Sequence, residues 1–315
     1  IMTGLYPHAA GMFRNKLVMR QDAKSIAEMV SGDYLRAYFG KWHLGDEVVR
    51  QHGFEEWVSV MDRLWAEYTK PEYSGRPTDY HQFLLDNGLK PDQEAPGGDI
   101  FSDEMRSGLP AELQMASFLA GRAASFIESN RDRPFILYVS FLEPHPPFNG
   151  PYNDLYDPAS LPVGPAFLKK PKNAPLISRL RADNNMQFLE GSSESYGHYV
   201  EDQITSPNDI SSEYGWRQLR ARYLANITLV DDMVGMIVTS LTEQGLMDDT
   251  IIVFTSEHGE MAGDHGMLEK RSQKYFPIAA SKRILPDSSA SGFFEIFREH
   301  RNTALKGLIQ PPGGQ

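Results

Sequence analysis

Short apolar runs alternate with stretches of helical periodicity along this chain. The runs lie at residues 34–39, 135–142 and 250–255, and each is apolar at most of its positions. Near-continuous apolar character over this length is typical of a strand that is covered on both faces, as in a mostly parallel sheet. We therefore expect three buried strands at these positions.

Two amphipathic helices are predicted between the runs, over residues 111–130 and 216–246. Apolar residues recur three or four positions apart in both stretches, which is the spacing of one helix face. The first helix places on that face Leu113, Phe118, Leu119, Ala123, Phe126 and Ile127. The second places there Leu219, Tyr223, Ile227, Val230, Val234, Ile237 and Leu241. Helices that alternate with buried strands indicate an α/β fold, a doubly wound, mostly parallel sheet with helices on both faces.

Two segments fall outside this alternation. Residues 149–214 are rich in Pro, Gly, Ser and Asn and have little periodicity, so we expect a long surface excursion near the active face. A disordered insertion is the alternative for the same segment. Residues 281–315 form a weak tail for which we expect no strand partner.

Composition excludes several classes of function. The chain has 31 basic and 42 acidic residues, and the resulting net charge of −11 argues against a nucleic-acid-binding surface. The absence of cysteine excludes a disulfide, a cysteine-ligated zinc and a cysteine nucleophile within the chain. No apolar run approaches the roughly 20 residues that a membrane span needs, and no signal peptide is recognised. The first residue is Ile1, which suits processing or a fragment of a longer protein.

Polar residues with catalytic chemistry follow each of the three apolar runs. Ligands bind beyond the carboxyl ends of the strands in sheets of this kind, so the segments after the runs matter most. These segments read GKWHLG, EPHPPF and TSEHGEMAGDHGMLEK, and their reactive side chains are Lys41, His43, His145, Glu257, His258 and Lys270. We expect them to meet at one rim of the sheet as a site for a metal and an anion.

Each of these elements has an ordinary structural interpretation when it is taken alone. A Lys-x-His loop is usually solvated surface, a histidine between prolines usually packs on a neighbour, and SEHGE reads as a polar turn. His258 and His265 are seven positions apart, which is not the helical pair of a zinc protease. His265 has two interpretations, contact with substrate or support of its own loop. The coincidence of three such segments at equivalent strand ends favours a site.

The motifs resemble those of type I sulfatases, which belong to the alkaline-phosphatase-like superfamily. TGLYPH at residues 3–8, GKWHLG, HPPF at 145–148, VDDMVG at 230–235 and TSEHGEMAGDHGMLEK occur in the order of that family. The resemblance covers residues 1–273 and implies a partial catalytic domain over residues 1–275. Residues 276–315 are then an unmatched, poorly ordered tail. The implied activity is hydrolysis of the sulfate ester of a sugar, aryl or alkyl alcohol.

The resemblance also implies a role for each matched residue. In this family a formylglycine, made from a Cys or Ser, attacks the sulfur while a divalent cation and lysines neutralise the sulfate oxygens. By motif match, Lys41 and Lys270 bind the nucleophile and the sulfate, and His265 contacts the sulfate. His145 protonates the departing alcohol oxygen and also binds the sulfate. His43 is the base that regenerates the aldehyde, a role that suits an imidazole near neutral pH.

Glu257 and His258 match the two late metal ligands of the family. The first ligand is usually Asp, and the second, an imidazole, admits Mn²⁺ or Zn²⁺ where Ca²⁺ prefers oxygen. Calcium is the expected cation. The nucleophile motif and the early acidic ligands would lie upstream of Ile1, and a further small sheet domain would follow the matched region. We therefore expect an internal piece of a sulfatase that does not turn over by itself.

Two other functions compete with this interpretation. A phosphate or phosphonate ester hydrolase of the same superfamily would use a Thr, Ser or formylglycine nucleophile, and His258 as a ligand keeps it open. A non-catalytic product that only binds anions is the third hypothesis, supported by the missing nucleophile. For the complete protein we expect a periplasmic, extracellular or lysosomal-type compartment. The sequence indicates neither an oligomeric state nor the alcohol half of the substrate.

Overall fold

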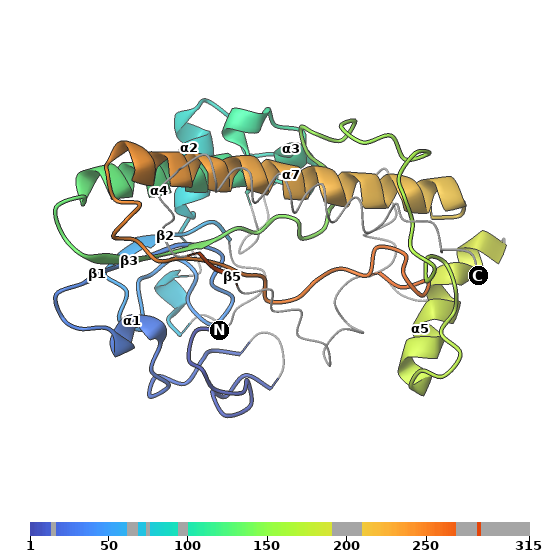
Figure 1. The fold of residues 1–315 in the computed structure, drawn as a ribbon, viewed down its shortest axis with the longest axis horizontal. Helices are drawn as coiled ribbons and strands as arrows, with labels where there is room; N and C mark the ends of the chain where they lie inside the picture. Colours follow the sequence, from blue (N-terminus) through green and yellow to red (C-terminus); the bar gives the residue numbers. More distant parts are fainter. Residues whose placement is uncertain are drawn as a thin grey trace. The chain divides into compact units, whose positions relative to one another are not determined.

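The chain divides into two compact units. A computed structural model describes residues 1–13, 17–61, 69–73, 76–93, 100–190, 210–268 and 282–284. Unit 1 comprises Ile1–His145 and Leu229–Leu246, and unit 2 comprises Pro146–Thr228 and Met247–Gln315. Figure 1 shows the elements of both units coloured along the sequence.

Unit 1 is built on a parallel sheet. Its strands are β1 (Leu35–Gly40), β2 (Glu56–Val58) and β3 (Phe135–Ser140), in the order β2-β1-β3. Both pairings of β1 are parallel, and its register with β3 runs from Leu35 opposite Phe135 to Gly40 opposite Ser140. The strands predicted at residues 34–39 and 135–142 are confirmed, as is the α/β class with a parallel sheet. β3 ends two residues earlier than predicted.

Helical elements cover both faces of β1. Successive strand residues point to opposite sides, so neighbouring residues of β1 contact different helices. Tyr38 faces an aromatic cluster in which the rings of Trp42, Phe54, Trp57 and Tyr138 lie between 4.9 and 5.2 Å from its own. That cluster also packs on Ala27 of the short helix α1 (Ile26–Met29), which is fully buried. The neighbouring Phe39 points the other way and meets Phe126 of α4 (Met115–Ser129) at 5.5 Å between ring centroids. α4 and α1 accordingly lie on opposite sides of the sheet in Figure 1.

The predicted helix at residues 111–130 is confirmed as α4, preceded by a 3-10 turn, η2 (Ala111–Leu113). The helix proper begins at Met115 because Gln114 has extended backbone angles, φ −66° and ψ 151°. The predicted apolar face from Phe118 to Ile127 is buried. Before α4 come η1 (Pro71–Tyr73), α2 (Asp79–Asp86) and α3 (Asp103–Ser107).

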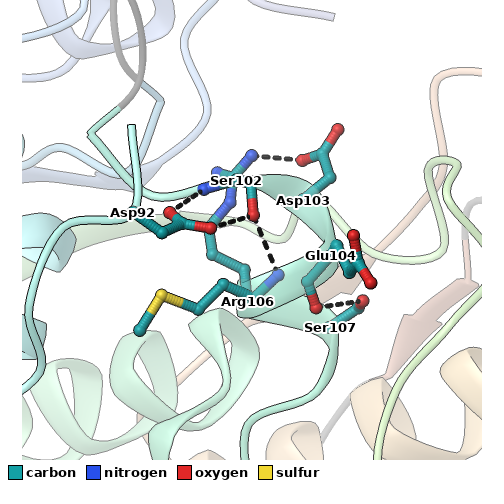
Figure 2. A network of polar contacts seen from close by, with 7 residues as sticks. Asp92, Ser102, Asp103, Glu104, Arg106 and Ser107 are labelled. Carbon is teal, nitrogen blue, oxygen red and sulfur yellow. Dashed lines mark hydrogen bonds and ion pairs between the residues drawn. The ribbon is translucent and has the colours of Figure 1, made fainter. Parts of the chain in front are cut away.

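Polar contacts fix the short helix α3, as Figure 2 shows. The hydroxyl of Ser102 caps it by accepting a hydrogen bond from the Met105 N–H at 3.1 Å. The Asp92 carboxylate in turn accepts from the Ser102 N–H at 2.7 Å and from its hydroxyl. Arg106 pairs with Asp103 one turn earlier. A capped N-terminus with acidic residues in the first turn stabilises a helix that is too short to be stable by propensity alone.

The long helix predicted at residues 216–246 is confirmed as α7 (Glu213–Glu243). Its first part belongs to unit 2, and from Leu229 onward it belongs to unit 1. By length and apolar composition alone α7 meets the requirements of a membrane span, and it is the one helix in the described part of the chain that does. Core helices of soluble proteins meet the same two requirements. The expectation of no membrane span therefore stays a prediction.

The third predicted strand differs from expectation. Residues Ile252–Phe254 form β4, which pairs antiparallel with β5 (Lys282–Ile284) rather than joining a parallel sheet. Val253 is 62% exposed and Phe254 42% exposed, so the prediction of a strand buried on both faces was wrong. An apolar run indicates a strand, but it does not select the partner strand. The expectation of no strand partner for the tail was wrong for Lys282–Ile284, and the remainder of the tail lies outside the described residues.

The excursion predicted at residues 149–214 is partly helical and partly packed. It contains α5 (Leu176–Met186) and the 3-10 turn η3 (Gln187–Glu190). Phe167 and Ile210 from this segment join a hydrophobic core with Phe148 and Trp216. The Trp216 indole N–H also donates to the Ile210 carbonyl at 2.9 Å. The alternative of a disordered insertion was therefore wrong for residues 149–190 and 210–214.

Packing of α4 on the sheet buries the ring of Phe126, so we expect Phe126→Ala to destabilise the fold. Phe126 is 6% exposed and its ring meets both Phe39 and Phe135. Truncating such a ring should lower the free energy of unfolding by about 3–5 kcal/mol, measured by urea denaturation. Arg122→Ala, on the exposed face of the same helix, should change it by less than about 0.5 kcal/mol. Equal effects of the two changes would contradict the packing described.

Candidate active site

The loop that carries Lys41 and His43 starts in contact with the end of β3. Gly40, the last residue of β1, has φ +120°, and a Cβ there would lie 2.0 Å from the Ser140 carbonyl oxygen. Only glycine allows this approach. It lets the Lys41 N–H donate to the same carbonyl at 3.1 Å. Lys41 therefore begins its loop directly beside the end of β3.

Two nearby side chains, Tyr38 near the end of β1 and Glu47 further along the loop, hold its backbone at three successive residues. The Tyr38 hydroxyl donates to the Lys41 carbonyl. The Glu47 carboxylate accepts from the Trp42 N–H at 3.0 Å through Oε2 and from the His43 N–H through Oε1. His43 has φ 58°, a left-handed conformation that a non-glycine residue adopts only when its surroundings fix it. Its side chain is half-buried.

Glu47 is a buried carboxyl with an unusual proton affinity. It is 2% exposed, and burial raises its pKa to about 7, against the opposing effects of the two backbone N–H groups and the Lys41 charge. Its own backbone is fixed as well, because the Trp57 indole N–H donates to the Glu47 carbonyl at 2.7 Å. The Glu47 carboxyl therefore lies at a defined position, in contact with the backbone N–H groups of Trp42 and His43.

The His145 loop at the end of β3 is anchored on α4. Glu143 Oε1 accepts from the Ala116 N–H in the first turn of α4 at 3.2 Å. Its Oε2 is shielded from solvent without a hydrogen-bond partner among the residues that the structure describes, and burial raises the pKa of the carboxyl. A turn follows in which the His145 N–H donates to the Leu142 carbonyl at 3.0 Å. His145 is half-buried at the end of this turn.

Two of the three predicted strand ends therefore meet as expected. Gly40 and Ser140 are paired in the β1–β3 register, so the Lys41–His43 loop and the His145 loop leave the sheet from neighbouring carboxyl ends. The third group, Glu257, His258 and His265, belongs to unit 2. Lys270 lies outside the described residues. The convergence of all three groups on one rim stays a prediction.

In unit 2, Glu257 and His258 place two metal-ligand atoms close together. Glu257 Oε1 lies 3.3 Å from His258 Nε2, and both side chains reach solvent, with 68% and 34% of their surface exposed. His258 Nδ1 faces the Gly259 carbonyl at 2.9 Å, which favours the tautomer with the proton on Nδ1 and the lone pair on Nε2. Neighbouring ligands of one divalent cation lie about 3 Å apart, so the pair fits two positions around such an ion.

The surroundings of this pair are electronegative. Burial and then the charges of Glu260 and Glu257 raise the pKa of Tyr223 to about 12. A negative local potential favours a cation at the Glu257–His258 pair. Within the described ranges no third histidine or carboxylate completes a metal cluster with them.

Three hydrogen bonds to other segments hold the loop of His265, whose imidazole is exposed. The His265 N–H donates to the Ala166 carbonyl at 2.8 Å, and the residue has φ 57°. The guanidinium of Arg220 on α7 donates to Asp264 at 3.2 Å. The side-chain amide of Asn185 on α5 donates to the Gly266 carbonyl at 3.3 Å. The packed excursion thus supports the backbone of this loop and leaves the His265 ring accessible.

Sequence reasoning missed the residues that hold these loops. They are Tyr38, Glu47 and Glu143 in unit 1 and Asn185 and Arg220 in unit 2. The only local signal is the position of Glu47 and Glu143 close to the motifs that they support. A carboxylate in a loop usually reads as surface, and nothing in its neighbours predicts burial. Arg220 and Asn185 are distant in sequence and carry no signal.

The chain matches one protein family over most of its length. The family model described as Sulfatase matches residues 1–284. The multifunctional alkaline phosphatase superfamily protein PehA of Trinickia caryophylli is 33% identical over 174 residues, which cover 52% of this chain and 31% of that protein. The choline-sulfatase of Rhizobium meliloti is 26% identical over 280 residues, covering 84% and 48% respectively. The chain thus spans about a third to a half of these relatives.

Solved structures of the same fold include the phosphonate monoester hydrolase of Silicibacter pomeroyi. It superimposes with a TM-score of 0.56 at 23% identity, over 85% of this chain and 54% of that chain. This likeness supports the fold that residues 1–284 share with the family.

The raised pKa of Glu47 predicts a pH-dependent stability. The carboxyl titrates near 4.5 when unfolded and near 7 when folded, so the unfolded chain binds fewer protons between these values. Stability should therefore fall as pH rises from about 4.5 to about 7, by about 3 kcal/mol for this group at the upper limit.

Urea denaturation at several pH values would measure this dependence, with Glu47→Gln as the comparison. The free energy of unfolding of the variant should depend less steeply on pH, because the contribution of Glu47 is lost while those of all other groups remain. The same pH dependence in both proteins would show that the Glu47 carboxyl does not titrate in this range.

Proposed function

Because the chain belongs to the sulfatase family, we propose that it carries most of the catalytic centre of a sulfuric ester hydrolase. The observation that supports this most is the geometry of unit 1. The Lys41–His43 loop and the His145 loop leave neighbouring strand ends with their backbones fixed by buried side chains. The activity belongs to the whole protein, since the chain spans only part of the relatives that it matches.

The residues of unit 1 supply a positive charge and two proton-transfer groups. The Lys41 ammonium would neutralise charge that develops on the sulfate oxygens. The His145 imidazolium would donate its proton to the alcohol oxygen as the S–O bond breaks, and His43 would accept the proton released when the nucleophile is regenerated. We propose a formylglycine as that nucleophile, on the basis of the family. Lys270 and His265 are proposed to bind the sulfate from the other loops.

Glu257 and His258 are proposed as two ligands of a divalent cation, with Ca²⁺ as the first candidate and Mn²⁺ as the second. Their donor atoms are 3.3 Å apart and the tautomer of His258 presents Nε2. The cation, when bound, would withdraw charge from the sulfate oxygens. Further ligands must come from elsewhere, because no group of three histidine or acidic residues that could hold a metal ion is present among the described residues.

A phosphonate or phosphate ester hydrolase is the second candidate. It is favoured by the 33% identity to PehA over 174 residues, a protein described as a multifunctional member of the alkaline phosphatase superfamily. A cationic site of lysines and a divalent metal accepts either tetrahedral anion, so a comparison of substrates is the test that separates the two candidates. The names of choline-sulfatase and of the alkaline phosphatase superfamily, to which PehA belongs, make small sulfate and phosphate esters the substrates to compare first.

We expect Lys41→Ala to lower kcat/KM for 4-nitrophenyl sulfate on the order of 100-fold in the full-length protein that carries this sequence. The fold should be unchanged by circular dichroism, because the lost group is a charge and not a core contact. Lys24→Ala removes an exposed lysine of the same unit and should leave turnover unchanged. Near-normal turnover of Lys41→Ala would refute the assignment. Faster hydrolysis of 4-nitrophenyl phenylphosphonate than of the sulfate would favour the second candidate.

For the metal, Glu257→Gln should weaken Ca²⁺ binding by at least about tenfold, because it removes the charge of one ligand. Isothermal titration with Ca²⁺, and separately with Mn²⁺, measures this without relying on activity. Glu213→Gln removes a carboxylate that pairs with Arg217 on the surface of the same unit, and it should leave the affinity unchanged. Unchanged affinity in Glu257→Gln would show that the cation binds elsewhere.

A further inference from the structure

The Glu47 carboxylate binds the backbone beside a residue that we propose to transfer a proton. Its two oxygens accept from two consecutive backbone N–H groups, Oε2 from Trp42 at 3.0 Å and Oε1 from His43. A carboxylate can accept through both oxygens at once, whereas a carboxamide has one acceptor and one donor end. The bond to His43 lies on the same residue whose imidazole is proposed to move the proton.

The conformation of His43 makes this contact more than a general loop anchor. With φ 58° the residue sits in the left-handed region, which costs a non-glycine residue free energy and persists only when neighbouring contacts fix it. The peptide of His43 is fixed by Glu47 on its N–H side, and the preceding Trp42 ring is locked in the aromatic cluster around Tyr38. That backbone geometry fixes the direction of the Cα–Cβ bond of His43 and so limits the positions that its imidazole can reach.

We propose that Glu47 is a positioning residue that sets the orientation of the His43 imidazole for proton transfer. This inference deepens the proposed function and rests on it. Glu47 touches no substrate in this assignment and acts only through the Trp42 and His43 peptide groups. Its burial, at 2% exposure, strengthens the two bonds, because hydrogen bonds are stronger away from bulk solvent.

Asp46 provides a matched comparison within the same loop. It is also buried, at 6% exposure, and its two oxygens also accept a pair of bonds, from the Thr69 N–H at 2.7 Å and the Thr69 hydroxyl at 2.5 Å. These bonds tie the loop to Thr69 and not to the peptide of His43. Loss of a buried, doubly bonded carboxylate is therefore common to Glu47→Gln and Asp46→Asn, but only the first affects His43.

The experiment compares wild type, Glu47→Gln, Glu47→Asp, Asp46→Asn and His43→Ala in the full-length protein. Initial rates with 4-nitrophenyl sulfate give kcat and KM, and nuclear magnetic resonance titration of the imidazoles gives the pKa of His43. The His43 signal is assigned by its absence from His43→Ala. Circular dichroism checks that each variant is folded. Glu47→Asp keeps the charge on a shorter side chain and serves if Glu47→Gln does not fold.

Glu47→Gln should lower kcat by at least about tenfold while KM changes less than about twofold, because misorientation affects proton transfer more than sulfate binding. The pKa of His43 should shift in Glu47→Gln and stay at its wild-type value in Asp46→Asn, whose kcat should also stay near wild type. Wild-type kcat and an unshifted His43 pKa in the Glu47 variants would overturn the proposal. Equal losses in Glu47→Gln and Asp46→Asn would also overturn it, since they would reveal only general loop stability.

Failure of the proposed function is distinguishable from failure of this inference. If His43→Ala retains wild-type turnover, His43 is not the proton-transfer group and the proposed function is wrong in that respect. The His43 pKa in the Glu47 variants then still reports whether Glu47 influences the imidazole, independently of turnover. If His43→Ala is inactive and Glu47→Gln is fully active, the function stands and the positioning role falls.

Discussion

The contact between Gly40 and the Ser140 carbonyl is the constraint on which the candidate site in unit 1 depends. A side chain at Gly40 would place its Cβ 2.0 Å from that oxygen, so the close parallel pairing of β1 and β3 requires glycine at this position. Because β1 stays paired to its last residue, Lys41 leaves the sheet beside the end of β3. Paired parallel strands bring their carboxyl ends to the same edge of a sheet, so two loops that are far apart in sequence become neighbours.

Carboxyl groups shielded from solvent then hold the backbones of these loops in place. Glu47 holds the Trp42 and His43 peptides, and Glu143 joins the His145 turn to the first turn of α4. Burial raises the pKa of both groups, which is the cost of keeping a carboxyl away from water. Glu47 binds the backbone of His43, and Glu143 anchors the loop of His145. Neither carboxyl group is itself proposed to touch substrate.

Unit 2 fixes its loop by a different means. The segment around His265 is held through hydrogen bonds with Ala166, Asn185 and Arg220, which come from the excursion and from α7. The excursion therefore has a supporting role for a proposed sulfate-binding residue in addition to any part in substrate selection. In this unit the Glu257–His258 pair, which we propose as metal ligands, is partly exposed and so accessible to an ion from solution.

Sequence patterns were enough to predict the α/β class, the strands β1 and β3, the helices α4 and α7, and the motifs that mark Lys41, His43 and His145. These depend on local periodicity and on residues close together in the chain, which sequence patterns record directly. Three features could be seen only in the folded chain. β4 pairs antiparallel with β5, the excursion packs through Phe167 and Ile210, and the carboxyl groups of Glu47 and Glu143 support the loops. Strand partners and the burial of a polar side chain are set by contacts between distant segments, and no local pattern in the sequence specifies them.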